Sequence, residues 1–99
     1  MYIENIDLGT IKINKKHSFL GLIRNNSEFP ITIIRVQVSC SSCTDANARK
    51  KEILPGEEVL MDISYTPFSL GVHDKSITVH YIENNVVLEY RFVFKAIII

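Results

Sequence analysis

The segment Ser76-Ile77-Thr78-Val79-His80-Tyr81 is followed by Glu83-Asn84-Asn85 and then by Leu88-Glu89-Tyr90-Arg91-Phe92-Val93-Phe94-Lys95. Apolar residues recur in both runs with a period of two, which places alternate side chains on opposite faces of a β-strand. The polar Glu-Asn-Asn between the runs is typical of a tight turn. The stretch therefore predicts a β-hairpin whose buried face carries Ile77, Val79, Tyr81, Leu88, Tyr90, Phe92 and Phe94.

The same period recurs along most of the chain, and we expect further strands over residues 2–13, 17–24, 30–38 and 59–65. Gly9 interrupts the first of these, as a bulge or a switch between sheets would. The inward row changes phase by one residue after Ile33, which predicts a bulge near Ile33 and Ile34. We expect irregular loops over residues 39–51, where no apolar period is present, and over residues 66–74.

About seven strands, with turn signals every 8–12 residues or so, are the sequence pattern of an immunoglobulin-like sandwich. Composition agrees, because the apolar residues are mostly Ile and Val and alanine occurs only three times. We therefore predict an all-β fold consisting of one immunoglobulin-like β-sandwich domain over residues 1–99.

Charge and hydropathy argue against several classes of partner. Eleven basic and eleven acidic residues cancel, so no overall field favours nucleic acid. No apolar run approaches the roughly 18 residues that a membrane span requires, and no signal peptide is visible. No phosphate-binding glycine loop or other small-molecule site is evident. We expect a virion or cytoplasmic location, or the periplasm and cell envelope if the chain is a trimmed part of a longer protein.

Several short motifs occur in an order that points to a known group of domains. They are Ile6-Asp7-Leu8-Gly9-Thr10-Ile11, Asn25-Asn26-Ser27-Glu28-Phe29-Pro30-Ile31-Thr32-Ile33, Val38-Ser39-Cys40-Ser41-Ser42-Cys43-Thr44, Ile53-Leu54-Pro55-Gly56-Glu57, Ile63-Ser64-Tyr65-Thr66-Pro67, Gly71 and Ile77-Thr78-Val79. Together they resemble a family of bacterial immunoglobulin-like domains of unknown function, related to the ASH, PapD and major sperm protein group. The resemblance covers about residues 6 to 95 and implies a fold rather than a particular chemistry.

The chain departs from the family pattern at three points. Two residues separate Cys40 and Cys43, where the family usually has one, and Ser27 stands where a turn glycine is usual. Family members usually carry an export or lipoprotein signal, which this sequence does not display. These departures leave the periplasmic or surface location that the resemblance implies as an expectation to be tested.

Cys40 and Cys43 form a Cys-x-x-Cys pair, for which three readings are open. A redox pair needs a thiol of lowered pKa, typically at a helix N-terminus, and no helix is expected here. Structural zinc needs four ligands, and no second cysteine pair exists. A structural pair at a strand end is the third reading and the one we favour. A Ser-His-Asp triad has no supporting motif, so we expect no catalytic residue, no metal and no cofactor.

The remaining candidates are surface positions that could contact a partner protein. Leu20 and Leu22 face away from the expected core row of their strand, and Val87 leads into the last strand. The chain ends in three isoleucines, which either pair within their own sheet or dock on a neighbouring subunit. The long polar loop carries a basic run. The predicted contact residues are Leu20, Leu22, Arg49, Lys50, Val87, Ile97, Ile98 and Ile99.

A lone domain of this kind is expected to act by binding other protein subunits in a larger assembly, not by catalysis. By analogy of fold, the setting that we expect first is a bacteriophage virion, as a capsid decoration or auxiliary protein. The alternative is a bacterial envelope-associated domain that binds partners or acts as a chaperone-like edge. A third possibility is thiol-redox or metal chemistry at the cysteine pair.

Overall fold

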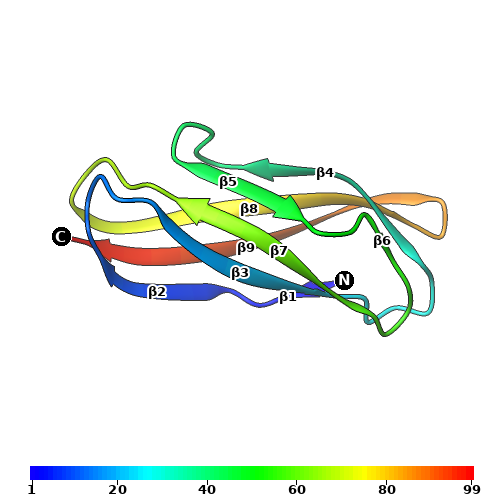
Figure 1. Ribbon diagram of the computed structural model, residues 1–99. Helices are drawn as coiled ribbons and strands as arrows, with labels where there is room; N and C mark the ends of the chain where they lie inside the picture. Colours follow the sequence, from blue (N-terminus) through cyan, green and yellow to red (C-terminus); the bar gives the residue numbers. More distant parts are fainter.

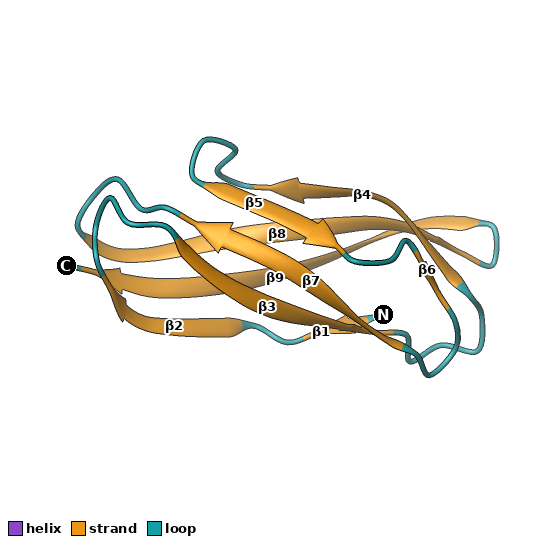
Figure 2. Cartoon of the chain, viewed as in Figure 1, coloured by secondary structure: helices purple, strands orange, loops and turns teal.

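The computed structural model describes residues 1–99 as two packed β-sheets without a helix (Figures 1 and 2). The four-stranded sheet has the order β1-β3-β7-β5, and its strands are β1 (Tyr2–Ile3), β3 (His17–Arg24), β7 (Glu58–Tyr65) and β5 (Thr44–Ala48). The five-stranded sheet has the order β2-β9-β8-β4-β6, with β2 (Ile6–Ile11), β9 (Val86–Ile98), β8 (Gly71–Glu83), β4 (Ile31–Val38) and β6 (Glu52–Ile53). The predicted all-β sandwich is confirmed.

The predicted hairpin is the longest unit of the fold. Strands β8 and β9 pair antiparallel over 13 residues each. Asn84 and Asn85 connect them with φ values of 49° and 61°, the left-handed conformation that a tight two-residue turn requires and that Asn tolerates. The prediction of a loop over residues 66–74 is wrong in its second half, because residues 71–74 pair with β9. These residues form a strand because they pair with β9, although their own sequence has no strand-like apolar period.

The N-terminal segment divides between the two sheets. Strand β1 pairs antiparallel with β3, whereas β2 pairs parallel with β9. Asn5 lies at the crossing, and its side-chain Oδ1 accepts a hydrogen bond of 2.9 Å from the Val93 N–H. Gly9 has a φ of 68° and lies within a register shift between Asp7 and Thr10, so the predicted bulge is confirmed. The sheet switch itself occurs earlier, at Glu4 and Asn5.

Strand β5 was not expected, and the prediction of an irregular loop over residues 39–51 is wrong at its centre. Residues Thr44–Ala48 pair antiparallel with β7. Their sequence, Thr-Asp-Ala-Asn-Ala, lacks large apolar side chains, so it carries no apolar period, although Ala46 and Ala48 pack against the core. The predicted bulge near Ile33 and Ile34 is confirmed by a register shift between Ile33 and Arg35.

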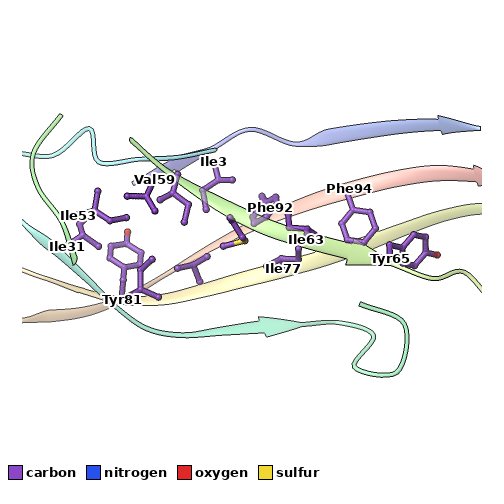
Figure 3. Packing of buried hydrophobic residues seen from close by; sticks show 14 of the residues in the cluster. Ile3, Ile31, Ile53, Val59, Ile63, Tyr65, Ile77, Tyr81, Phe92 and Phe94 are labelled. Carbon is purple, nitrogen blue, oxygen red and sulfur yellow. The ribbon is translucent and has the colours of Figure 1, made fainter. Parts of the chain in front are cut away.

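The core lies between the sheets and consists of rows contributed by strands of both (Figure 3). Tyr65 and Phe94 meet edge to face, with ring centroids 5.1 Å apart, and Phe19 packs on Phe94 at 5.3 Å. Gly21 is buried in the same layer, and a Cβ there would lie 3.2 Å from the Ile63 side chain. The predicted inward rows of β8 and β9 line this core.

Asn25 is a fully buried polar residue whose hydrogen bonds connect the two sheets at one end of the sandwich. Its Nδ2 donates to the carbonyl oxygens of Phe29 at 2.7 Å and Ile53 at 2.9 Å. Its Oδ1 accepts from the Ser27 N–H at 3.0 Å and the Ser27 hydroxyl at 2.8 Å. Two backbone hydrogen bonds join the same residue to the Pro-Gly turn before β7. One residue therefore connects β3, β6 and two turns.

Cys40 and Cys43 form a disulfide that closes the turn between β4 and β5, with Cα atoms 5.5 Å apart. The carbonyl oxygen of Cys40 also accepts hydrogen bonds from the N–H groups of Cys43 and Thr44. The Thr66 N–H donates to the Cys43 carbonyl at 2.8 Å, which fixes the turn to the end of β7. The pair lies in the turn that follows β4, as expected for a structural pair at a strand end, and a redox-active pair would form the same disulfide.

Replacing Asn25 with alanine is expected to lower the free energy of unfolding by about 2–4 kcal/mol, because the carbonyl oxygens of Phe29 and Ile53 each lose a donor in the interior. Urea denaturation monitored by circular dichroism measures this change. The matched control is Asn26→Ala at the exposed neighbouring position, for which we expect a change within about 0.5 kcal/mol. Equal effects of the two substitutions would contradict the structural importance assigned to Asn25.

Reducing the disulfide is expected to lower the free energy of unfolding by about 2 kcal/mol while the fold persists, because the loop that it closes is very short. The backbone hydrogen bonds of the turn remain. Urea denaturation with and without a reductant measures the difference. A variant with Cys40→Ser and Cys43→Ser serves as the control and is expected to be insensitive to the reductant. Complete unfolding on reduction would show that the turn depends on the disulfide far more than its hydrogen bonds imply.

Candidate binding surface

Two of the predicted contact residues, Leu20 and Leu22, lie on the outer face of the four-stranded sheet with 52% and 42% exposure. Leu22 lies opposite Leu60 in the register of β3 and β7. Beside Leu20, an open hollow of about 760 Å³ crosses β3, β7 and β5, and polar groups line much of it, including Ser18, Asp45, Asn47, Asp62 and Ser64. This face is mostly polar, with a narrow apolar strip along β3.

The basic residues Arg49 and Lys50 are engaged within the chain. Arg49 forms a bidentate ion pair with Asp62, in which both hydrogen bonds are 2.9 Å long. These hydrogen bonds raise the pKa of Arg49 and lower the pKa of Asp62. Lys50 Nζ lies 2.8 Å from Glu57 Oε2. That hydrogen bond, followed by one from the Leu54 N–H, lowers the pKa of Glu57. Both cations therefore already have anionic partners.

The three C-terminal isoleucines differ in exposure. Ile98 is only 2% exposed, so its prediction as a contact residue is wrong: strand alternation turns it into the core. Ile97 and Ile99 are 47% and 61% exposed. The Ile99 N–H donates to the Ile11 carbonyl, and the Ile99 carbonyl accepts from the Ile13 N–H. The tail thus pairs within its own sheet and still presents two apolar side chains.

Three further apolar residues, on the loop before β8 and at the start of that strand, are exposed, and none of them was predicted from the sequence. Phe68, Leu70 and Val72 are 61%, 66% and 71% exposed. Val72 lies opposite Ile97 in the β8–β9 register. The loop that carries the first two and the C-terminus lie at the same end of the sandwich (Figure 1). We call this surface the apolar end, and it consists of Phe68, Leu70, Val72, Ile97 and Ile99.

The signal for the apolar end was present in the sequence as Phe68-Ser69-Leu70-Gly71-Val72. Because this run was predicted to be part of a loop, strand alternation could not be used to decide which of its apolar side chains are exposed. Val87, the remaining predicted contact residue, is 66% exposed but lies beside the hairpin turn at residues 84–85. Figure 1 places that turn at the opposite end of the molecule, so Val87 and the apolar end are separate surfaces.

Ser69 and His73 form the one serine–histidine pair in hydrogen-bond contact. The His73 Nε2 lies 3.2 Å from the Ser69 hydroxyl oxygen and 3.0 Å from the Ser69 carbonyl oxygen. A carbonyl oxygen can only accept a hydrogen bond, so this nitrogen carries a proton when it bonds the carbonyl and cannot then deprotonate the hydroxyl. No cluster of three or more His, Cys, Asp or Glu side chains is arranged to hold a metal ion. No helix is long and apolar enough to cross a membrane.

Solved structures share this fold. The Vibrio cholerae VesB protease superposes with a TM-score of 0.80 at 10% identity, over 95% of this chain and 30% of that one. The ASH/PapD-like domain of human CEP192 gives a TM-score of 0.65 at 11% identity, over 99% and 84% of the two chains. The YadV chaperone gives 0.61 at 14% identity, over 98% and 50%. These similarities confirm the predicted immunoglobulin-like, PapD-related fold.

The chain corresponds to less than a third of VesB and to half of YadV. No curated protein sequence matches it. The match to a sequence family, by contrast, extends over residues 2–96, nearly the whole chain. The protein therefore belongs to the family described as "Protein of unknown function (DUF1573)", as the resemblance of its motifs indicated.

Proposed function

We propose that this chain is a non-catalytic protein-binding module and that its setting is the bacterial envelope. The observation that carries the binding function is the apolar end, where five large apolar side chains are each at least 47% exposed. Contiguous exposed apolar surface on a folded domain commonly marks an interaction site, because contact with a partner removes it from water.

The geometry of the apolar end favours a protein partner over a small molecule. The nearby hollow beside Val72 and Ile97 has a volume of about 240 Å³, below the roughly 300 Å³ at which small-molecule pockets begin. The side chains of this surface belong to the edge of a sheet and an adjoining loop, and charged residues lie beside Val72 and Ile97. Lys95 and Asp7 border the hollow and form a weak ion pair at 3.9 Å.

The polar groups of the chain are poorly suited to catalysis. The His73 nitrogen that faces the Ser69 hydroxyl carries a proton when it bonds the Ser69 carbonyl, so it cannot activate that hydroxyl. The ion pairs of Arg49 and Lys50 are exposed and internally neutral. Tyr65 and Tyr81 have raised pKa values because they are buried, so their hydroxyl groups stay protonated near neutral pH. None of these groups forms a pair in which a base faces a nucleophile that it could deprotonate.

Two features support the envelope as the setting. The Cys40–Cys43 disulfide suits an oxidising compartment such as the periplasm, since cytosolic thiols are kept reduced. The fold is similar to that of the YadV chaperone, whereas none of the three similar structures offers support for a virion. The virion setting that we expected first is therefore the weaker of the two.

Binding through the apolar end is testable by site-specific photo-crosslinking in the native cells. A photoreactive residue at position 72 is expected to yield a discrete crosslinked species, because Val72 is 71% exposed and lies opposite Ile97. The matched control is position 28, which is exposed in the turn between β3 and β4. Combining Val72 crosslinking with Ile97→Lys is expected to abolish the species. Identical crosslinks from positions 72 and 28, or none, would reject this surface.

The envelope setting predicts the redox state of the cysteines in intact cells. Alkylation under denaturing conditions, after rapid acid quenching, is expected to leave Cys40 and Cys43 unmodified unless a reductant is added first. A mass-shifting maleimide read on a gel measures the fraction that is oxidised. The Cys40→Ser, Cys43→Ser variant gives the background. Full alkylation without a reductant would place the protein in a reducing compartment and exclude the envelope.

A further inference from the structure

Strand β5 leaves one of its edges without a partner. It pairs only with β7, and the Cys43 carbonyl and the Arg49 N–H, which flank the strand, both bond toward β7. Hydrogen-bonding direction alternates along an antiparallel strand. The backbone groups of Ala46 and Ala48 therefore point away from β7, toward the open side of the sheet.

Strand β4 presents a second free edge to the same side. The Ser39 N–H donates to a carbonyl of β8, so by the same alternation the backbone groups of Val36 and Val38 face away from β8. Earlier in the strand, the Ile33 N–H donates to the Lys51 carbonyl at 2.7 Å, which closes that part of the edge. The remaining gap between Val36–Val38 and Ala46–Ala48 has no backbone hydrogen bonds across it. We call this gap the β4–β5 opening.

A hollow of about 220 Å³ lies in the β4–β5 opening. That volume is below the roughly 300 Å³ typical of small-molecule pockets and is suited to part of a peptide. The apolar part of its lining is made of five residues of β4 and β5, two of which are alanines. It consists of Ile33, Val36, Ala46 and Ala48, together with the more exposed Ile34.

The charged part of the lining is basic. Arg35 and Lys51 both border the hollow, both are exposed, and neither takes part in an ion pair. Their neighbours Arg49 and Lys50 are, in contrast, paired with Asp62 and Glu57. Two free cations beside an apolar hollow complement a ligand with carboxylates next to an apolar side chain.

We propose that the β4–β5 opening is a docking site for an extended segment of a partner protein, in which Asp or Glu residues flank one apolar residue. The segment adds a strand to the free edge of β5 and hydrogen-bonds the backbone of Ala46 and Ala48. Its apolar side chain fills the hollow, and its carboxylates bind Arg35 and Lys51. The proposal rests on the protein-binding function but uses a surface separate from the apolar end.

A selection from a displayed library of random peptides, about eight residues long to match an ordinary strand, tests this directly. The wild-type chain is expected to enrich sequences with Asp or Glu beside an apolar residue. A variant with Arg35→Glu and Lys51→Glu is expected to lose the acidic preference and to bind the enriched peptides about tenfold more weakly. The matched control is Lys12→Glu with Lys15→Glu, which makes the same charge change at exposed positions between β2 and β3.

The edge itself is tested by Ala46→Pro, which removes an outward N–H without removing a hydrogen bond to β7. The enriched peptide is expected to lose binding to this variant and keep it with Ala46→Ser. Amide shifts in ¹⁵N spectra are expected at Val36, Val38, Ala46 and Ala48. No enrichment, enrichment that survives the charge reversal, or shifts confined to Val72 and Ile97 would overturn the proposal. Loss of crosslinking at position 72 would leave these results unchanged, so the two binding surfaces fail independently.

Discussion

The buried amide of Asn25 is the interaction on which the arrangement of the two sheets depends at one end. It lies just beyond the end of β3 and donates to two carbonyl oxygens, including that of Ile53 in the opposite sheet. This explains why the turn accommodates Ser27 in place of the usual glycine: Ser27 has no positive φ, and its hydroxyl adds hydrogen bonds to Asn25 and Phe29. Asn25 thereby connects the turn after β3 to the Pro-Gly turn before β7, and this connection fixes where β4 and β7 begin.

Away from that end, the fold is governed by how its edges are covered. Strand β2 lies along β9 and leaves a bulged edge at Gly9, while β1 is only two residues long. Bulges and very short strands are poor templates for uncontrolled pairing. The β4–β5 opening is different because two regular edges face the same gap and the disulfide turn joins them. Along Val36–Val38 and Ala46–Ala48, neither a bulge nor a very short strand limits pairing with another chain.

The candidate functional surfaces share few residues with the core. Apart from Ile33, which is a core residue, the apolar end and the β4–β5 opening consist of exposed or half-buried side chains, whereas the aromatic cluster around Phe94 lies between the sheets. Substitutions at Val72, Arg35 or Lys51 therefore separate binding from stability, which substitutions at Asn25 cannot do. Exposed ion pairs such as Arg49–Asp62 add little to stability and keep the outer face of the four-stranded sheet charged.

Strand periodicity and turn chemistry are local properties, so the all-β class, the β8–β9 hairpin, both bulges and the inward rows were predictable from the amino-acid order alone. Thr44–Ala48 was not, since its order as a strand comes from pairing with β7. The same division holds for the candidate sites. Ile97 and Ile99 were identifiable as apolar, but the burial of Ile98 and the meeting of Val72 with Ile97 depend on register. Arg35 and Lys51 approach one hollow only because a bulge and a backbone hydrogen bond between distant residues bring them there.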